Sequence, residues 1–501
     1  MRSAADRPAP RRLTVRDLAV LSALLMADIL STFELTMVYT AMPTISRAFD
    51  HASDVVWLVT AGLLVSATAC ALCGRLGDIY GRSRILLIVM GISCVGSFIA
   101  ALATGLPQLI VGTALQGSAG AILPLALAIV RERFSTERVP LFVGILLSGS
   151  MVGAVAGLVI GGYLVDAIGW HSIYIVSGSF AATAILAVAT VVGVRSDAAV
   201  GAQHTAMLRG VLFAPAIAML LFAITKLREW GLADPRVLAP GLGAILIFVL
   251  WARHQLREEH PLIDLRLLRR RSMALPYLCI CLLGLGAMQH TLVLSMFLQQ
   301  PLATGAGLGL SATLAGYALV PVRIGGAVAS PFGGSLVQKL GARTVLMLGA
   351  GLTGIGWLII AAFQHSLPMI MVGMMLEGTA HIVIYVAASS AILQAAPNDR
   401  VGEAAGLGSV FRAAMVAVGT QFVAVLLATS SAAESGGAPS QMAYSYVFTY
   451  VAVTCGLIVL IAWFMPPSIQ AAAISDSSTR KFKEPRAANS TQYADPRIEG
   501  S

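Results

Sequence analysis

Charged residues are scarce in this chain. Of its 501 residues only 11% are Asp, Glu, Lys or Arg, whereas about 25% is usual for soluble globular domains. Hydrophobic residues make up 57% of the sequence, and its mean hydropathy is +0.83. A composition this poor in charge excludes a soluble globular protein, so we expect an all-α protein that crosses a lipid bilayer many times.

Motifs for nucleotides and metals are missing as well. There is no Gly-x-x-x-x-Gly-Lys-Ser/Thr loop and no loop long enough for an ATPase domain, so energy would have to come from an ion gradient. The six cysteines lie inside apolar runs, where a thiol behaves as a small hydrophobic group. We interpret the Cys70-x-x-Cys73 spacing as coincidence and expect no cofactor, no bound metal and no enzymatic activity.

Apolar runs of about 20 residues, the length that crosses a bilayer core as a helix, recur along the chain. They predict fourteen spans, near 18–42, 52–73, 85–104, 107–130, 140–165, 172–194, 208–225, 237–252, 274–297, 311–335, 344–363, 367–392, 404–430 and 444–465. An even number of spans places both termini on the same side of the membrane.

The distribution of basic residues predicts which side that is. With the N-terminus inside, the cytoplasmic segments hold 27 of the 33 Lys and Arg residues and the outer loops hold 4. Because cytoplasmic loops are enriched in Lys and Arg, segments 1–17 and 466–501 are predicted to be cytoplasmic tails, the second of them disordered. The same topology explains the net charge of +9, so we expect no nucleic-acid partner.

Two segments are repeated at nearly one offset. VGTALQGSAGAI from Val111 returns as VGMMLEGTAHIV from Val372, and GRLGDIYGRSR from Gly74 returns in degraded form as GSLVQKLGART from Gly334. We infer two homologous six-helix bundles, 18–194 and 274–465. Segment 195–273 would then be a linker that holds an inserted pair of transmembrane helices.

The loop GRLGDIYGRSR resembles the signature loop of the major facilitator superfamily, Gly-x-Leu-Ala-Asp-x-x-Gly-Arg-Arg/Lys. The family implies two pseudo-symmetric bundles around a central site. A gating role is predicted for residues Gly74, Gly77, Asp78, Gly81 and Arg82. The Asp78 carboxylate would cap the N-terminus of the eleventh span or pair with Arg82 on the cytoplasmic side; the alternative is that it only sets a turn.

Acidic residues inside the spans are rare, since a charged side chain at the bilayer centre costs about 2.5–3.5 kcal/mol on insertion scales. There are three: Asp28, Glu34 and Glu377. Segment 33–45, FELTMVYTAMPTI, resembles the first-span motif of the fourteen-span drug/proton antiporter branch of the EmrB and QacA type, with Glu34 at the acid's place. The resemblance implies proton coupling at Glu34; the alternative is a glutamate that faces a wet cavity without titrating. Asp28 is either a coupling residue or a structural hydrogen-bonding group.

Glu377 and His381 are four residues apart on one helix face, so they could share a proton. The alternative is a local hydrogen bond that only packs the helix. The repeat aligns Glu377 with Gln116, which suggests a common substrate cavity. Its predicted lining is Gln116, Glu34, Glu377, Arg323 and Arg412, the two arginines as counter-charges. His290 is interpreted as a hydrogen-bonding residue.

Glycines follow one another at intervals of four in segment 149–162. Gly149, Gly153, Gly157 and Gly161, with Gly162 beside them, predict close packing against another helix. The segment resembles the antiporter motif Gly-x-x-x-Gly-Pro-x-x-Gly-Gly, but Leu158 replaces its proline. Thr113 likewise stands where the family's fourth-span pattern has an arginine that is linked to proton transfer.

These features predict a multi-pass protein of the inner or plasma membrane, a monomer. We expect it to export lipophilic compounds, including cationic drugs, in exchange for protons by alternating access. Two alternatives remain at this point. One is export of an endogenous lipid or lipophilic metabolite, and the other is a non-transporting membrane sensor or assembly partner.

Overall fold

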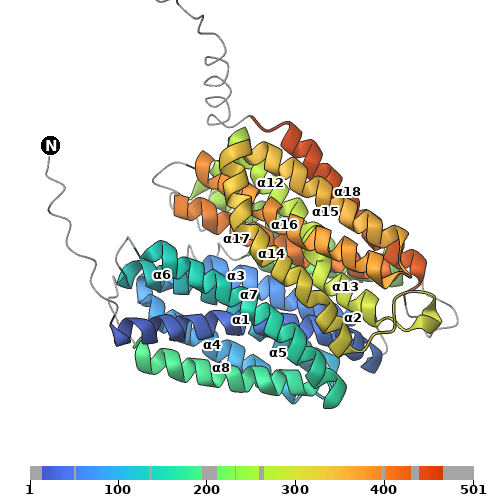
Figure 1. Ribbon diagram of the computed structural model, residues 1–501, viewed down its shortest axis with the longest axis horizontal. Coiled ribbons are helices and arrows are strands. Elements are labelled where there is room, and N and C mark those ends of the chain that lie inside the picture. The colour runs from blue at the N-terminus through green and yellow to red at the C-terminus, as the bar shows by residue number, and fades with distance from the viewer. Residues whose placement is uncertain are drawn as a thin grey trace, which may run out of the picture.

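The fold was examined in a computed structural model. The residues that it describes are 14–49, 52–134, 138–193, 212–231, 233–258, 265–396, 401–429 and 439–466. Helices make up its regular structure throughout this part of the chain (Figure 1). Most of the two predicted tails lies outside the described residues.

The first half of the chain contains these helices: α1 (Val15–Ala48), α2 (Ala52–Val55), α3 (Trp57–Tyr80), α4 (Arg82–Ala101), α5 (Leu106–Gln116), η1 (Gly117–Ala121), α6 (Ile122–Arg133), α7 (Val139–Ala167), α8 (His171–Val191), α10 (Phe213–Trp230) and α11 (Pro235–Arg257). The second half contains η2 (Leu265–Arg269), α12 (Arg271–Leu285), η3 (Ala287–Gln289), α13 (His290–Gln299), η4 (Leu302–Thr304), α14 (Ala312–Leu340), α15 (Ala342–Ala362), α16 (Leu367–Ala395), α17 (Val401–Leu427) and α18 (Gln441–Trp463).

Twelve helices in the described residues are long and apolar enough to cross a bilayer. The predicted second and seventh spans correspond to α3 and α10, whose apolar stretches, Trp57–Cys73 and Phe213–Ile224, are shorter. Each stretch ends next to a residue whose side chain lies outside the described residues, and α3 and α10 themselves continue to Tyr80 and Trp230. The described part of the chain is therefore an all-α membrane fold with twelve candidate spans, and the count of fourteen stays a prediction.

Two of the predicted spans are broken. Segment 107–130 consists of α5, η1 and α6, and segment 274–297 consists of α12, η3 and α13. At the first break a Cβ atom on Gly117 would overlap the backbone of Gly62 in α3, and at the second a Cβ atom on Gly286 would overlap the side chain of Thr454. Both segments still count as single candidate spans, Leu106–Arg133 and Arg271–Gln299, and the short 3-10 turn in each lies where another helix comes close.

The helices form two groups that lie side by side (Figure 1). One group, from α1 to α8, is drawn in blue to green, and the other, from α12 to α18, in green-yellow to red. Helices α10 and α11 pack mainly on each other, and α10 also contacts α3 and α17. The pair therefore lies beside the junction of the two groups.

The sequence repeat has a matching structure. Gly81 (φ 93°) follows α3 and Gly341 (φ 80°) follows α14, in a backbone conformation that favours glycine. Their amides donate equivalent hydrogen bonds of 3.0 Å, to Gly77 and Val337 respectively. Both halves thus turn the chain in the same way between the corresponding helices.

Candidate functional site

Glu34 is buried in α1 and is held by two serines of α4. The Ser93 hydroxyl donates to Oε2 of Glu34 at 2.8 Å, and the Ser97 hydroxyl lies 3.3 Å from Oε1. Only 3% of Glu34 is exposed. Both carboxylate oxygens therefore have a hydroxyl partner, which lowers the cost of burying the group.

Gln116 joins the same network from α5. Its Nε2 donates to the Ser97 hydroxyl at 2.8 Å, so an amide and a carboxylate meet at one serine. Gln116 and Glu34 also line one cavity of about 80 Å³ between α1, α3, α5 and η1. The other lining residues include Leu58, Val59 and Leu63, so the cavity places a few polar groups in an apolar wall.

Thr113 lies in the wall of this cavity, at the place where the antiporter pattern has an arginine. Its hydroxyl donates to the backbone carbonyls of Leu109 and Ile110, at 3.0 and 3.1 Å. The hydroxyl group therefore makes its hydrogen bonds within α5. A threonine at this position supplies no positive charge to Glu34.

Asp28, also in α1, faces a different neighbour. The Ser150 hydroxyl of α7 donates to its Oδ2 at 2.5 Å, while Oδ1 is buried without a partner. Asp28 and Glu34 are thus separated round the helix, as their spacing predicted.

The glycines of α7 lie against α1. A Cβ atom would lie 2.5 Å from the Ile29 carbonyl oxygen at Gly153 and 2.7 Å from the Phe33 carbonyl oxygen at Gly157. At the flanking positions, Gly149 lies against the end of the Leu25 side chain and Gly161 lies less tightly against Met37, both in α1. No side chain fits between these helices, so the stripe fixes the distance from α7 to the helix that carries both acids.

In the loop predicted to act as a gate, the described contacts stay within the first group of helices. The Arg82 guanidinium donates to the Ala128 carbonyl at 3.0 Å and lies 3.7 Å from the Glu132 carboxylate, both in α6. The side-chain environments of Gly74 and Asp78 lie outside the described residues. The gating role of this loop stays a prediction.

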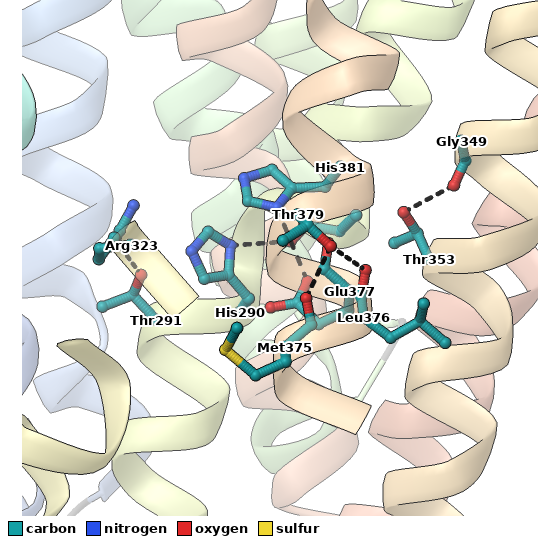
Figure 2. A network of polar contacts seen from close by, with 11 residues as sticks. His290, Thr291, Arg323, Gly349, Thr353, Met375, Leu376, Glu377, Thr379 and His381 are labelled. Atoms are coloured by element: carbon teal, nitrogen blue, oxygen red, sulfur yellow. Dashed lines mark hydrogen bonds and ion pairs between the residues drawn. The ribbon is translucent and has the colours of Figure 1, made fainter. Parts of the chain in front are cut away.

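Glu377 and His381 lie in α16, and His290 begins α13. The Glu377 side chain is fully buried, its Oε2 is 3.9 Å from Nδ1 of His381, and the rings of His290 and His381 have centroids 4.5 Å apart (Figure 2). Gly356 packs beside Glu377 as Gly96 packs beside Gln116, which agrees with their alignment in the repeat.

The two intramembrane arginines occupy different surroundings. Arg323 donates a hydrogen bond to the Thr291 hydroxyl, next to His290 (Figure 2). Arg412 lies over the ring of Tyr385, with 5.8 Å from its Cζ to the ring centroid. The residues that line the 80 Å³ cavity belong to the first group of helices. The shared cavity predicted for Glu377, Arg323 and Arg412 together with Glu34 therefore remains a prediction.

Hydrogen bonds join the two groups of helices at the end where α7 finishes, the predicted outer side. Asp166 of α7 accepts from the backbone amides of Ala312 and Thr313, at 3.1 and 2.8 Å, and from the Thr313 hydroxyl at 2.5 Å. It thus caps the first turn of α14. Nearby, Gly162 packs on the same turn, since a Cβ atom there would lie 2.6 Å from the Ala312 carbonyl oxygen.

Two buried amides reinforce this junction. Gln299 of α13 donates to the Thr40 carbonyl at 3.1 Å, and Gln421 of α17 donates to the Thr60 hydroxyl at 2.8 Å. Thr40 lies near the end of α1 and Thr60 near the start of α3. The structure therefore represents a conformation that is closed on the predicted outer side.

Several of these partners were missed by sequence reasoning. Ser93 and Ser97 are four apart on an otherwise apolar span, and that polar face was the signal that could have revealed them. Nothing local marks Ser150 or Asp166, because their partners belong to distant helices.

The chain is similar in sequence to known membrane transporters. Residues 24–319 and 277–491 match the family model described as the Major Facilitator Superfamily. The chain is 26% identical over 430 residues to the multidrug resistance protein B homolog of Mycobacterium tuberculosis (strain CDC 1551 / Oshkosh), with 84% of this chain and 78% of that protein covered. It is 30% identical over 406 residues to the uncharacterized MFS-type transporter YvkA of Bacillus subtilis (strain 168), covering 79% and 88%.

Among solved structures, the crystal structure of the peptide transporter POT in complex with sulfate is similar in fold. Its TM-score is 0.67 at 14% sequence identity, and the superposition covers 94% of this chain and 97% of that one. At this identity the likeness concerns the arrangement of helices alone.

Proposed function

Because the chain belongs to the major facilitator superfamily, it is a secondary transporter and not an enzyme, and we propose that it exports small lipophilic compounds, cationic ones among them, in exchange for protons. Its relationship to multidrug resistance proteins supports export of drugs. The resemblance of segment 33–45 to the antiporter motif supports coupling to protons.

One observation carries this proposal: the Glu34 carboxylate lies in the wall of an apolar cavity. Apolar surface binds lipophilic solutes, and a buried carboxylate favours either a proton or a cationic solute. Antiport requires a group that binds the proton and the solute in turn but not together, and a carboxylate of this kind can do so.

We further propose the complete topology. Helices α3 and α10 would complete fourteen spans in the inner or plasma membrane, with both termini in the cytoplasm. Segments 18–194 and 274–465 would be two bundles that rock about the central site, and segment 195–273 would hold the extra pair. The acids Asp28 and Glu377, with His381, would assist Glu34 in moving protons.

Everted membrane vesicles loaded with protons test the proposed function. We expect a lipophilic cation added outside to release protons and to accumulate in the vesicle. Movement of a lipid without any response to drugs would favour an endogenous lipophilic substrate. If neither drugs nor lipids move, a sensor or assembly partner is favoured.

The Asp166 cap yields a prediction about conformation. Asp166→Asn keeps the shape of the side chain but removes its negative charge from the N-terminal end of α14. The attraction between such a charge and a helix N-terminus contributes about 0.3–1 kcal/mol at an exposed site. We expect more molecules to open on the outer side, measured as faster maleimide labelling of Leu158→Cys in a background without native cysteines. Leu158 is fully buried and its backbone carbonyl lies against Gly316 of α14, so we expect a cysteine at this position to react only when the groups separate.

Asp234→Asn is the matched control for this experiment. Asp234 also caps a helix, since it accepts from the Arg236 amide at 2.7 Å, but it does so within α11 and not between the groups. Equal labelling in the two variants would show that Asp166 does not hold the outer side closed.

A second prediction concerns Glu377 and His381. If they share one proton, removing either residue ends the exchange, so the losses in Glu377→Gln and His381→Ala should not add in the double variant. Proton-driven drug uptake in vesicles is measured for the two single variants and for the double variant. Fully additive losses would mean that the contact only packs α16.

A further inference from the structure

Three buried side chains from two helices converge in the second group. His290, Glu377 and His381 each place one potential ligand atom within 4.8 Å of the other two. Figure 2 shows the two imidazole rings and the glutamate together, with Arg323 and Thr291 beyond His290. At most 5% of each of the three residues is exposed.

Three polar atoms of this cluster have no hydrogen bond. Both carboxylate oxygens of Glu377 and Nε2 of His290 are buried without a hydrogen bond. An unpartnered buried carboxylate is costly, so a structure retains one where something else binds it.

Hydrogen bonds to the backbone orient both rings. Nδ1 of His290 lies 3.1 Å from the Ala287 carbonyl oxygen, and Nδ1 of His381 lies 3.2 Å from the Glu377 carbonyl oxygen. A carbonyl only accepts, so each Nδ1 carries the proton and each Nε2 keeps its lone pair. Metal-binding histidines are oriented by the same kind of contact.

We propose that His290, Glu377 and His381 bind one divalent transition-metal ion of the Zn²⁺ class. Two imidazoles and a carboxylate suit Zn²⁺ better than Mg²⁺ or Ca²⁺, which prefer oxygen ligands. With ligand bonds of about 2.0–2.2 Å, a tetrahedral ion needs its donors about 3.4 Å apart. The present separations extend to 4.8 Å, and Nδ1 of His381 is the nitrogen 3.9 Å from the Glu377 carboxylate, so the side chains would draw together and offer Nε2 to the ion, with a fourth position open.

Arg323 sets the charge balance of the site. It is the basic residue that interacts electrostatically with Glu377, and its guanidinium bonds Thr291 next to His290. The arginine competes with the ion for the single negative charge of Glu377. Removing the arginine therefore strengthens ion binding.

The ion would cross-link two separate helical elements. His290 follows the η3 break between α12 and α13, whereas Glu377 and His381 belong to the continuous helix α16. Bound metal fixes the broken span against α16 and raises thermal stability. The bound ion would replace the proton that Glu377 and His381 are proposed to share, and the rise in thermal stability does not depend on the proposed transport reaction.

Metal binding is measured on the purified full-length chain in detergent, without a polyhistidine tag and after treatment with a chelator. We expect one Zn²⁺ per chain by mass spectrometry, a rise in Tm with Zn²⁺, and visible absorption bands of a tetrahedral ion when Co²⁺ is the probe. His290→Gln, His381→Gln and Glu377→Gln should each weaken binding by at least about 10–100-fold.

Two further variants separate metal binding from misfolding. His171→Gln is the matched control, because the His171 ring also contacts a backbone carbonyl, that of Ala103 at 3.3 Å, but lies in the other group of helices. It should bind Zn²⁺ as the parent does, and Arg323→Gln should bind it more tightly. No saturable binding in the parent, or binding that survives all three ligand substitutions, overturns the proposal.

Discussion

Glu34→Gln should abolish proton-driven export and leave the fold and the abundance in the membrane unchanged. The amide has the shape of the carboxyl group and still accepts a hydrogen bond from Ser93, but it cannot take up or release a proton. Drug-induced proton release from everted vesicles is the measurement, and we expect none. Binding of a neutral lipophilic compound should persist, because the apolar wall of the cavity is intact.

Glu258→Gln provides the comparison. Glu258 follows α11 outside the two groups and is paired with His254 at 3.7 Å, so its substitution removes one carboxylate far from the cavity. Proton release by this variant should equal that of the parent. Normal release by Glu34→Gln would refute the coupling role and leave Glu34 as a polar residue of the cavity wall.

Gly157→Val should also cause a large loss of transport, for steric reasons. The added side chain would collide with the Thr36 hydroxyl and the Phe33 carbonyl of α1, next to Glu34. Overpacking of this kind costs about 1–3 kcal/mol, and it displaces the helix that positions the carboxylate. Drug uptake in vesicles and the thermal stability of the purified protein should both fall.

Gly144→Val lies in the same helix and is the control for the added side chain. A Cβ atom at Gly144 meets nothing within 4 Å, so this substitution should leave uptake and stability unchanged. Equal behaviour of the two variants would contradict a packing role for the glycine stripe.

Local patterns in the sequence predicted the features that depend on a single helix. The interval of four between Gly153 and Gly157 was enough to predict a contact surface. The rarity of buried acids selected three candidates, and the resemblance of segment 33–45 to the antiporter motif singled out Glu34. Both signals arise from the geometry of one helix in a bilayer.

Features that depend on distant segments were not predictable in this way. The break at Gly117 follows from the approach of Gly62, and the cluster at Glu377 needs His290 from a helix far away in the sequence. A repeat can align Glu377 with Gln116, but it cannot say which side chains fill the space around each. Packing between helices decides that.

The cap on α14 differs from the other polar contacts in its exposure to water. Asp166 is exposed and Thr313 is half-buried, so water can replace each partner when they separate, and the contact adds only a small bias toward closure. Dissolved ions weaken an exposed contact between a charge and a helix end. The equilibrium between the closed and open conformations of this transporter would therefore shift with the ionic strength of the external medium. The hydrogen bonds of Glu34, which is buried among serines, would be insensitive to it.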